Sequence, residues 1–203
     1  MGSNRRNLRA EERRVQLLEA AGELVARRGW QALTMKAVAE EAGVSRRLLY
    51  DHFPDLSTLF ATFLRHKFER FARRRNTIFE GGAGTPPLET GVRLFLTLPP
   101  KDRRIFRALV SDVGPVTPES QAVRDEFRES ILAFWIPLIV AATGLAEGRA
   151  RAASWALANA IWSIADRVDD GTVDLEDAVK IAATILEGSV FTLRRWNARN
   201  ELS

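Results

Sequence analysis

The chain has 203 residues, a net charge of +4, no cysteine and two histidines, which excludes disulfides, thiolate zinc sites and histidine-rich metal sites. We therefore expect no metal and no cofactor. Hydrophobic residues make up 46% of the chain, as in an ordinary globular protein. The charge is uneven, because residues 1–76 carry 16 Lys and Arg against 9 Asp and Glu, whereas the rest carries 14 against 17. Such an excess of positive charge is typical of a surface that binds nucleic-acid phosphates.

The N-terminus is polar and rich in arginine, so we expect no signal peptide. An uncharged run extends from Ile131 to Ala146 and contains Pro137. It is shorter than the about 20 residues that a membrane-spanning helix needs, and we interpret it as a buried helix. The sequence therefore predicts a cytoplasmic, nucleoid-associated protein that contacts no membrane.

Residues 4–11 form a basic segment, whose arginines are either a solvated tail or an arm that reaches a DNA minor groove. The first helix is predicted over residues 10–28, where Leu17 and Leu24 share an apolar stripe. Gly29 is predicted to end it, because glycine readily adopts the left-handed conformation that terminates helices.

Residues 34–53 have the pattern of a helix-turn-helix, two short helices joined by a tight turn. Thr34 is a suitable N-cap for the first helix. Gly43 lies where the chain must leave that helix with a positive φ angle, which only glycine adopts at little cost. Ser45 is then a suitable N-cap for the second helix.

The second of these helices is predicted to have two different faces. Leu49 and Phe53, four residues apart, share its buried side. Arg46, Arg47 and Tyr50 remain on the outward side, which is cationic and can form hydrogen bonds. A face of this kind fits the major groove of DNA. The alternative is a helical hairpin in a helical protein, with arginines that are simply solvated.

The run from Val15 to Leu64 resembles the DNA-binding domain of the TetR family of bacterial transcriptional regulators. The matching pieces are LLEAAGELVARRGWQALTM and AVAEEAGVSRRLLYDHFPDLSTLF, and the ending YxHFP is specific. The resemblance implies an all-α fold of about nine helices. An N-terminal three-helix helix-turn-helix domain, residues 1–54, would be joined by a long helix to a C-terminal helical ligand-binding and dimerisation domain, residues 55–203.

The resemblance also implies which residues contact DNA. The family places four of them against phosphates, namely Thr34, Ser45, Tyr50 and His52. The first residues of the second helix reach base edges, and here these are Arg46, Arg47 and Leu48. Arginine pairs with guanine O6 and N7, and leucine can meet a thymine methyl group. Lys36 is a further candidate for a phosphate contact.

This chain departs from the family at two places. The family often has Gly or Pro and then Thr where this chain has Arg47 and Leu48. It often has Lys where this chain has Leu56, at the start of the fourth helix. Leucine cannot bind a phosphate, so that contact is in doubt, and Arg47 could compensate for it.

A long helix is predicted after Pro54, with Asp55 as its N-cap and a stripe of leucine and phenylalanine that continues to about Phe79. We interpret it as the connection between the two domains, followed by a loop over residues 81–87. Five further helices and no strand are predicted, over residues 88–98, 101–113, 118–143, 146–168 and 175–196. Thr117 and Asp174 are predicted N-caps.

The last two helices are predicted to form a homodimer. The helix over residues 146–168 is apolar on two opposite sides, so both sides should be buried. A chain this short cannot easily cover them alone, and a two-fold four-helix bundle would do so. The predicted interface residues are Leu157, Ile161, Ile164, Ile181, Ile185 and Ser189.

One stripe of the same helix places an amide and a carboxylate among large aromatic residues, which suggests a cavity for a mainly apolar ligand. The candidate lining residues are Phe95, Phe106, Phe134, Trp135, Trp155, Asn159, Trp162 and Asp166. The alternative is core packing, in which Asp166 pairs with an arginine at the helix end and Asn159 bonds a neighbouring backbone group.

The sequence thus predicts a ligand-responsive repressor that binds a palindromic DNA operator as a homodimer and is released by a small-molecule effector. A DNA-bound adaptor whose C-terminal domain binds a protein is the alternative. An enzyme has little support, because no Ser, His and acid grouping and no phosphate-binding loop after a strand is present.

Overall fold

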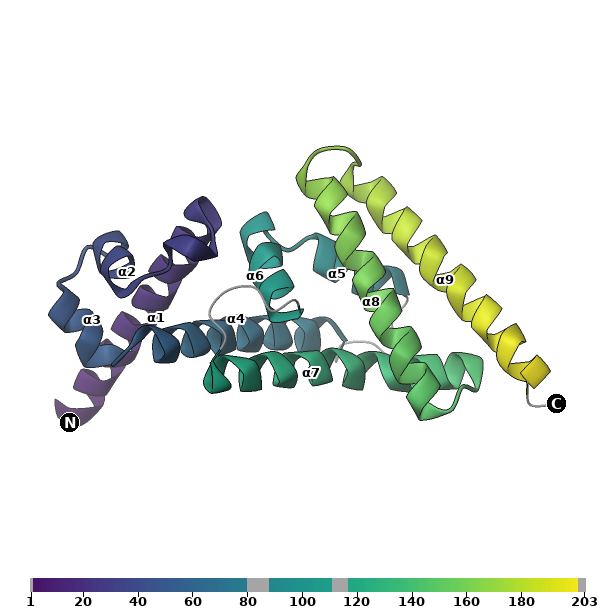
Figure 1. Cartoon of the computed structure of the whole chain (residues 1–203), viewed down its shortest axis with the longest axis horizontal. Coiled ribbons are helices and arrows are strands. Elements are labelled where there is room, and N and C mark those ends of the chain that lie inside the picture. Colours follow the sequence, from purple (N-terminus) through teal and green to yellow (C-terminus); the bar gives the residue numbers. More distant parts are fainter. Residues whose placement is uncertain (1, 80–87, 111–116, 201–203) are drawn as a thin grey trace. The chain divides into compact units, whose positions relative to one another are not determined.

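The computed structural model describes residues 2–79, 88–110 and 117–200, without the side chains of residues 2–9, 79, 108 and 200. In these ranges it has nine α-helices, one short 3-10 helix and no strand, which confirms the predicted all-α fold (Figure 1). The elements are α1 (Gly2–Arg28), η1 (Trp30–Ala32), α2 (Met35–Glu41), α3 (Arg46–His52), α4 (Leu56–Phe79), α5 (Leu88–Leu96), α6 (Pro100–Val110), α7 (Pro118–Thr143), α8 (Glu147–Asp169) and α9 (Leu175–Asn200). The predicted loop at residues 81–87 lies outside the described residues.

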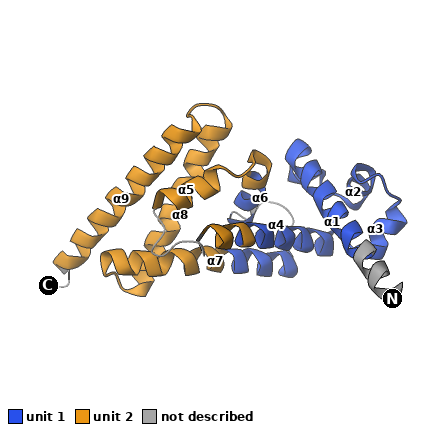
Figure 2. Cartoon of the chain, turned by 180° about the vertical axis from the view of Figure 1, so that it is seen from behind, with its two compact units in different colours: residues 1–72, 104–127 blue, residues 73–103, 128–203 orange. Residues whose placement is uncertain are grey.

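The chain folds into two compact units, each made of two segments (Figure 2). Unit 1 comprises residues 1–72 and 104–127, and unit 2 comprises residues 73–103 and 128–203. The chain passes from one unit to the other within α4, α6 and α7. The predicted domain boundary after residue 54 divides the chain by function. The two compact units are defined by packing alone, so they do not test that boundary, and it stays a prediction.

The predicted N-caps act as expected, because a side-chain oxygen of each accepts a bond from the backbone N–H three residues later. They are Thr34, Ser45, Asp55, Thr117 and Asp174. Gly29 ends α1 with a positive φ of 76° and a ψ of 174°, a combination that glycine adopts readily. Local sequence therefore determines where most of these helices begin.

Within the described residues, three helix boundaries differ from the prediction by more than one residue. The basic segment at residues 4–11 is not a separate arm but part of α1, because nothing in it interrupts a helix that begins at Gly2. Helix α5 ends at Leu96 instead of Leu98, since a residue before proline avoids the α conformation. Helix α9 continues to Asn200, because no glycine or proline follows Trp196.

The core of unit 1 joins the first helices to α4. Leu17 and Leu24 of α1 are fully buried, as predicted. Trp30 packs edge-on against Phe60 and Phe63 of α4, with ring centroids 5.4 Å and 6.3 Å apart. The aromatic anchor behind Gly29 therefore holds α1 against α4. Phenylalanine rings form a second cluster in unit 1, made of Phe68, Phe71, Phe106 and Phe127.

Glu19 provides a polar connection between the same two helices. Its carboxylate accepts bonds from Lys67 at 2.9 Å, Arg70 at 2.6 Å and His66 at 3.2 Å, all on α4. Burial raises the pKa of Glu19, but the bonds from Lys67 and His66 and the charge of Arg70 outweigh it and leave a pKa of about 2. The ionised carboxylate therefore stabilises the contact between α1 and α4.

The core of unit 2 is formed by α5, the end of α7, α8 and α9. It contains Val92, Leu96, Trp135, Ile139, Leu157, Ile161, Ala165, Ala178, Ala182 and Leu186. The predicted interface residues Leu157 and Ile161 thus lie in the core of their own chain. Ile181 and Ile185 of α9 are each 45% exposed, so they remain available for a contact between chains.

The uncharged run that was predicted as a buried helix forms the second half of α7. Leu132, Trp135, Ile139 and Thr143 are its buried residues within α7, and Leu145 is buried just after the helix. No single helix in the described ranges is long and apolar enough to cross a membrane. Helices α7 and α8 meet the criteria of length and apolar composition only when they are taken together, and they are bent by 114° relative to each other.

We predict that Glu19→Gln lowers the free energy of unfolding by about 1–2 kcal/mol at pH 7, because charged bonds to Lys67 and Arg70 are lost while partial exposure keeps the effect small. The folded pKa of Glu19 is lower than the ordinary value of 4.5, so its contribution is complete above about pH 4.5 and is lost as the pH falls toward 2. Urea unfolding followed by circular dichroism at several pH values measures this difference.

The control is Glu12→Gln, which removes an exposed carboxylate from the same helix and should leave the stability nearly unchanged. A destabilisation by Glu19→Gln of equal size at pH 7 and pH 2.5 would contradict a role for the charge.

Candidate nucleic-acid interface

The turn between α2 and α3 has a defined hydrogen-bond pattern. Gly43 adopts a φ of 64°, the N–H of Gly43 donates to the carbonyl of Glu40, and the N–H of Val44 donates to the carbonyl of Ala39. These two bonds form a Schellman motif, which ends a helix and turns the chain sharply. The motif therefore sets where α3 begins relative to α2.

Burial divides α3 into the two faces that were predicted. Leu49 and the following Phe53 are fully buried in unit 1. Arg46 and Arg47 are exposed, and Tyr50 is 50% exposed, a high value for a large aromatic residue. A helix held by its apolar side therefore presents two guanidinium groups and a phenol to solvent.

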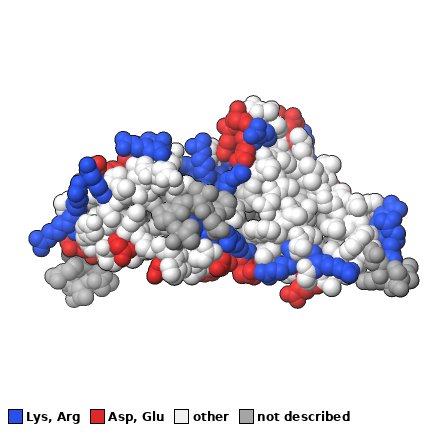
Figure 3. Space-filling model, viewed as in Figure 1, with Lys and Arg blue, Asp and Glu red and all other residues white. Residues whose placement is uncertain are grey.

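Among the residues that the structure describes, no carboxylate engages the two arginines. Neither Arg46 nor Arg47 forms a salt bridge with any residue that the structure describes, whereas Arg27 pairs with Glu41 and Arg65 with Glu126. Figure 3 shows Lys and Arg side chains projecting from the part of unit 1 that holds α2 and α3. Arginine forms bidentate hydrogen bonds to the guanine edge in the major groove, so these groups suit direct reading of bases.

The remaining predicted DNA contacts surround this face. Thr34 and Ser45 are exposed, and their hydroxyl oxygens accept the capping bonds. Each hydroxyl keeps its hydrogen for donation to a phosphate oxygen. Lys36 is exposed and lies 3.8 Å from Glu40, a solvent-screened pair that a phosphate can replace.

Leu48 and His52 are only half-buried rather than fully outward. Leu48 follows the two arginines in the first turn of α3, where an apolar contact with a thymine methyl group is still accessible. His52 lies in the last turn of α3, and its backbone carbonyl accepts a bond from Arg14 at 3.4 Å. The structure therefore places all the predicted DNA-contact residues on one helix-turn-helix.

Arg14 of α1 is a positioning residue that sequence reasoning missed. Besides its bond to the His52 carbonyl, its guanidinium carbon lies 4.7 Å from the centre of the Phe53 ring. It also donates to the Thr62 hydroxyl at 3.4 Å. A cation at the C-terminal end of a helix is favourable, because the carbonyl groups there carry partial negative charge. The pairing spans 38 residues, so no local pattern could reveal it.

The predicted ligand residues fall into separate groups. In unit 2, Phe95 packs edge-on against Trp162 with centroids 4.2 Å apart, and Phe134 packs against Trp135 at 5.4 Å. Asn159 is exposed and donates to the backbone carbonyl of Trp155 at 2.7 Å, as the core-packing alternative expected. Of the other predicted ligand residues, Asp166 is half-buried on α8. Phe106 lies in the phenylalanine cluster of unit 1.

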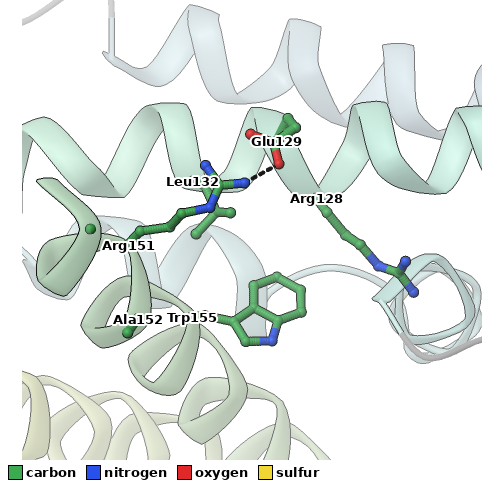
Figure 4. Close-up of a pocket in the computed structure, with 7 residues that line it drawn as sticks. Arg128, Glu129, Leu132, Arg151, Ala152 and Trp155 are labelled. Atoms are coloured by element: carbon green, nitrogen blue, oxygen red, sulfur yellow. Dashed lines mark hydrogen bonds and ion pairs between the residues drawn. The ribbon is translucent and has the colours of Figure 1, made fainter.

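A pocket of about 390 Å³ lies in unit 2 between α7 and the first turns of α8 (Figure 4). Its lining residues are Arg128, Glu129, Leu132, Gly148, Arg151, Ala152 and Trp155. Trp155 is the predicted ligand residue among them. The other lining residues carry no pattern that stands out in the sequence, because they come from two helices and meet only in the folded chain.

The predicted dimer residues outside the core lie at or near the surface. Ile181 and Ile185 are exposed on α9, and Ile164 and Ser189 are half-buried. Helix α8 also has an exposed stripe, in which small residues recur at spacings of four, three and four. This stripe is Ala152, Ala156, Asn159 and Ser163. Both helices therefore expose surfaces on which another helix can pack closely.

Proteins of similar sequence are bacterial transcriptional regulators. The family described as "Bacterial regulatory proteins, tetR family" matches residues 17–62, from α1 into α4. Over 153 residues the chain is 31% identical to the HTH-type transcriptional activator FasR of Mycolicibacterium smegmatis, covering 74% of this chain and 70% of FasR. The chain belongs to the TetR family. It is a DNA-binding transcriptional regulator and not an enzyme.

Other TetR-like proteins match over shorter stretches or in fold. The HTH-type transcriptional repressor KstR of Rhodococcus jostii is 39% identical over 64 residues, which are 32% of this chain and 30% of KstR. A transcriptional regulator from Rhodococcus sp. Rha1 has a TM-score of 0.73 at 18% identity, covering 88% of this chain and 96% of that one. The multidrug binding protein EbrR, complexed with imidazole, has a TM-score of 0.62 at 21% identity, covering 87% and 94%. These structures show the same fold.

We predict that Arg46→Ala or Arg47→Ala relaxes sequence preference at defined operator positions, at about 1–3 kcal/mol for each base pair that the side chain reads. Lys36→Ala and Tyr50→Phe should instead weaken binding to all sequences by a similar factor, because phosphates carry no base identity. Binding of each variant to a set of single-base operator changes, measured by fluorescence anisotropy, separates the two effects. An even loss across every sequence for both arginine variants would exclude base reading by these residues.

We predict that Arg14→Met lowers operator affinity about threefold to tenfold for all sequences, because α3 loses a charged bond at its C-terminal end. The dependence of affinity on salt should stay unchanged, since a positioning residue releases no counterions from DNA. Arg13→Met is the matched control on the same helix, because Arg13 is exposed and bonds only Gln16 among the contacts described for it. A smaller salt dependence for Arg14→Met would mean that Arg14 contacts phosphate itself.

Proposed function

We propose that this TetR-family protein is a ligand-responsive repressor that binds a palindromic operator as a homodimer. The observation that carries the proposal is the exposed side of α3, where Arg46, Arg47 and Tyr50 face solvent on a helix held by Leu49. A helix with this polarity enters the major groove by its N-terminal turns. Its site of action is then the nucleoid in the cytoplasm.

A dimer is supported by the surface of unit 2. Ile181 and Ile185 are each 45% exposed one helical turn apart on α9, and α8 exposes small residues that allow a close helix contact. A two-fold axis between two chains would give two α3 helices related by the same axis. Two such helices engage successive major grooves about 34–36 Å apart, which makes the operator an inverted repeat.

Repression is the simplest output of this arrangement. A protein that occupies a promoter blocks transcription by its presence, with no further surface required. Among the relatives, KstR is a repressor and FasR is an activator, so both repression and activation occur in similar chains. The shorter match to KstR and the geometry of α3 support DNA binding. Repression rather than activation is proposed because it requires the simpler mechanism.

Release by an effector requires that the ligand favours a conformation that does not fit the operator. Helix α4 is the covalent route for such a change, because it begins at Leu56 next to α3 and continues past Ala72 into the residues of unit 2. EbrR is described as a multidrug binding protein and holds imidazole, which supports a small-molecule effector for this chain as well. The predicted aromatic residues of unit 2 favour a mainly apolar ligand.

The test of DNA binding is selection of bound fragments from a pool of random duplex DNA by the full-length protein, followed by sequencing. We expect selected fragments to share two inverted half-sites about one helical turn apart. Selection without any shared sequence, or of a single half-site only, would contradict the proposal. A reporter gene placed behind the selected operator then distinguishes repression from activation.

We predict that Ile181→Arg combined with Ile185→Arg converts the dimer to a monomer of 22.7 kDa, because four charges would be buried in the interface. Both side chains are exposed in the single chain, so its fold should persist. The matched control is Ile78→Arg, which alters an isoleucine that is 40% exposed on α4. Sedimentation velocity at micromolar concentration measures the mass. A wild-type protein that sediments only as a monomer would contradict the proposal.

A further inference from the structure

The pocket between α7 and α8 combines an apolar side with a cationic side. Trp155, Leu132 and Ala152 provide the apolar side, and the volume of about 390 Å³ lies within the range of small-molecule sites. Figure 4 shows Arg128 of α7 and Arg151 of α8 on either side of the Trp155 indole. A half-buried tryptophan in such a position offers a flat surface on which an aromatic ring or an acyl chain can pack.

The charges that line the pocket sum to a net positive value, because Arg128 and Arg151 outnumber Glu129. Arg151 pairs with Glu129 across the rim, and their side chains are 49% and 60% exposed. An ion pair with this exposure is weakened by the surrounding water, so another carboxylate can replace Glu129 at little cost. The planar guanidinium binds a carboxylate through two parallel hydrogen bonds.

The start of α8 adds to the positive potential. Gly148, in the first turn of α8, lines the pocket, and the N-cap residue Ala146 forms no capping bond through its side chain. The first N–H groups of a helix carry partial positive charge, which attracts an anion. Glu147 in the same turn counts against this effect, so the helix end supports the arginines and does not replace them.

We propose that this pocket binds an amphipathic organic carboxylate, with its apolar body against Trp155 and its carboxylate on Arg151. The proposal rests on the function proposed above, because it names the chemical class of the effector. A neutral apolar ligand would make no use of the exchangeable guanidinium of Arg151, and a small inorganic anion would make no use of the Trp155 ring. The ligand competes with Glu129 for Arg151, so binding would separate the connection between α7 and α8 that this ion pair makes.

The direct test is calorimetric titration of the full-length protein with 2-naphthoate and decanoate and with the corresponding neutral amides. We expect at least one carboxylate to bind about tenfold more tightly than its amide, as the loss of one charged hydrogen-bonded contact implies. Equal affinity of carboxylate and amide for both pairs, or no binding by any of them, would overturn the proposal.

Variants then locate the site. Arg151→Met should weaken carboxylate binding about tenfold, whereas Arg149→Met, two positions earlier on the same helix and outside the pocket, should not. Glu129→Gln should strengthen binding severalfold, because the competing carboxylate is removed. Trp155→Ala should weaken both carboxylate and amide, with Trp196→Ala as the control on α9. Equal losses for Arg149→Met and Arg151→Met, in proteins with unchanged circular dichroism, would place the ligand elsewhere and overturn the proposal.

Titration of the carboxylate with and without selected operator DNA separates this site from the function on which it rests. If the carboxylate is an inducer, DNA must weaken its binding by the same factor by which the carboxylate weakens DNA binding. A carboxylate that binds through Arg151 with equal affinity in both titrations would establish the pocket and contradict a ligand response through it. Normal operator binding by a protein that binds no carboxylate would contradict the pocket alone. Loss of carboxylate binding on dimerisation, with full binding by the Ile181→Arg, Ile185→Arg monomer, would assign the pocket to a second copy of the chain and overturn the proposal.

Discussion

The positive φ angle at Gly43 is the constraint on which the DNA-binding surface depends. It allows the two bonds of the Schellman motif, which end α2 and bring Val44 and the capping hydroxyl of Ser45 into place for α3. A residue with a Cβ atom would be strained in this conformation by about 1–2 kcal/mol. Once the turn is set, the burial of Leu49 and Phe53 leaves only one side of α3 for Arg46 and Arg47.

The excess positive charge of the N-terminal half is divided between structure and recognition. Lys67 and Arg70 are bound by Glu19, and Arg14 is held against the end of α3, so these cations stabilise contacts between helices. Arg46 and Arg47 have no such partner in the described part of the chain and are exposed to solvent. Glu19 thus neutralises Lys67 and Arg70, whereas no carboxylate of the described residues neutralises the two arginines of α3.

Unit 2 differs from unit 1, where charged contacts connect the helices, because its core is mainly apolar. Two features of its surface are an apolar face on α9 and a pocket. The buried side of α8, with Leu157 and Ile161, completes the core with α5 and α9. The exposed isoleucines of α9 form a surface that another chain can cover, and the pocket beside Trp155 is the site proposed above for a small molecule. The proposed function would use both surfaces, one to pair two copies of α3 and one to receive a signal.

The sequence by itself determined the helix class, most N-caps, the turn at Gly43 and the family, because capping, helical periodicity and glycine conformation depend on residues within a few positions of each other. It also predicted which side of α3 is exposed, since Leu49 and Arg46 lie on one short helix whose two sides differ in polarity. Only the tertiary structure showed that Leu157 and Ile161 are core residues, because a helix apolar on both sides does not reveal which side its own chain covers. The Arg14 and Glu19 contacts and the Arg151–Glu129 pair at the pocket likewise depended on the folded chain, since their partners lie 22 to 51 residues away and meet only when the helices pack.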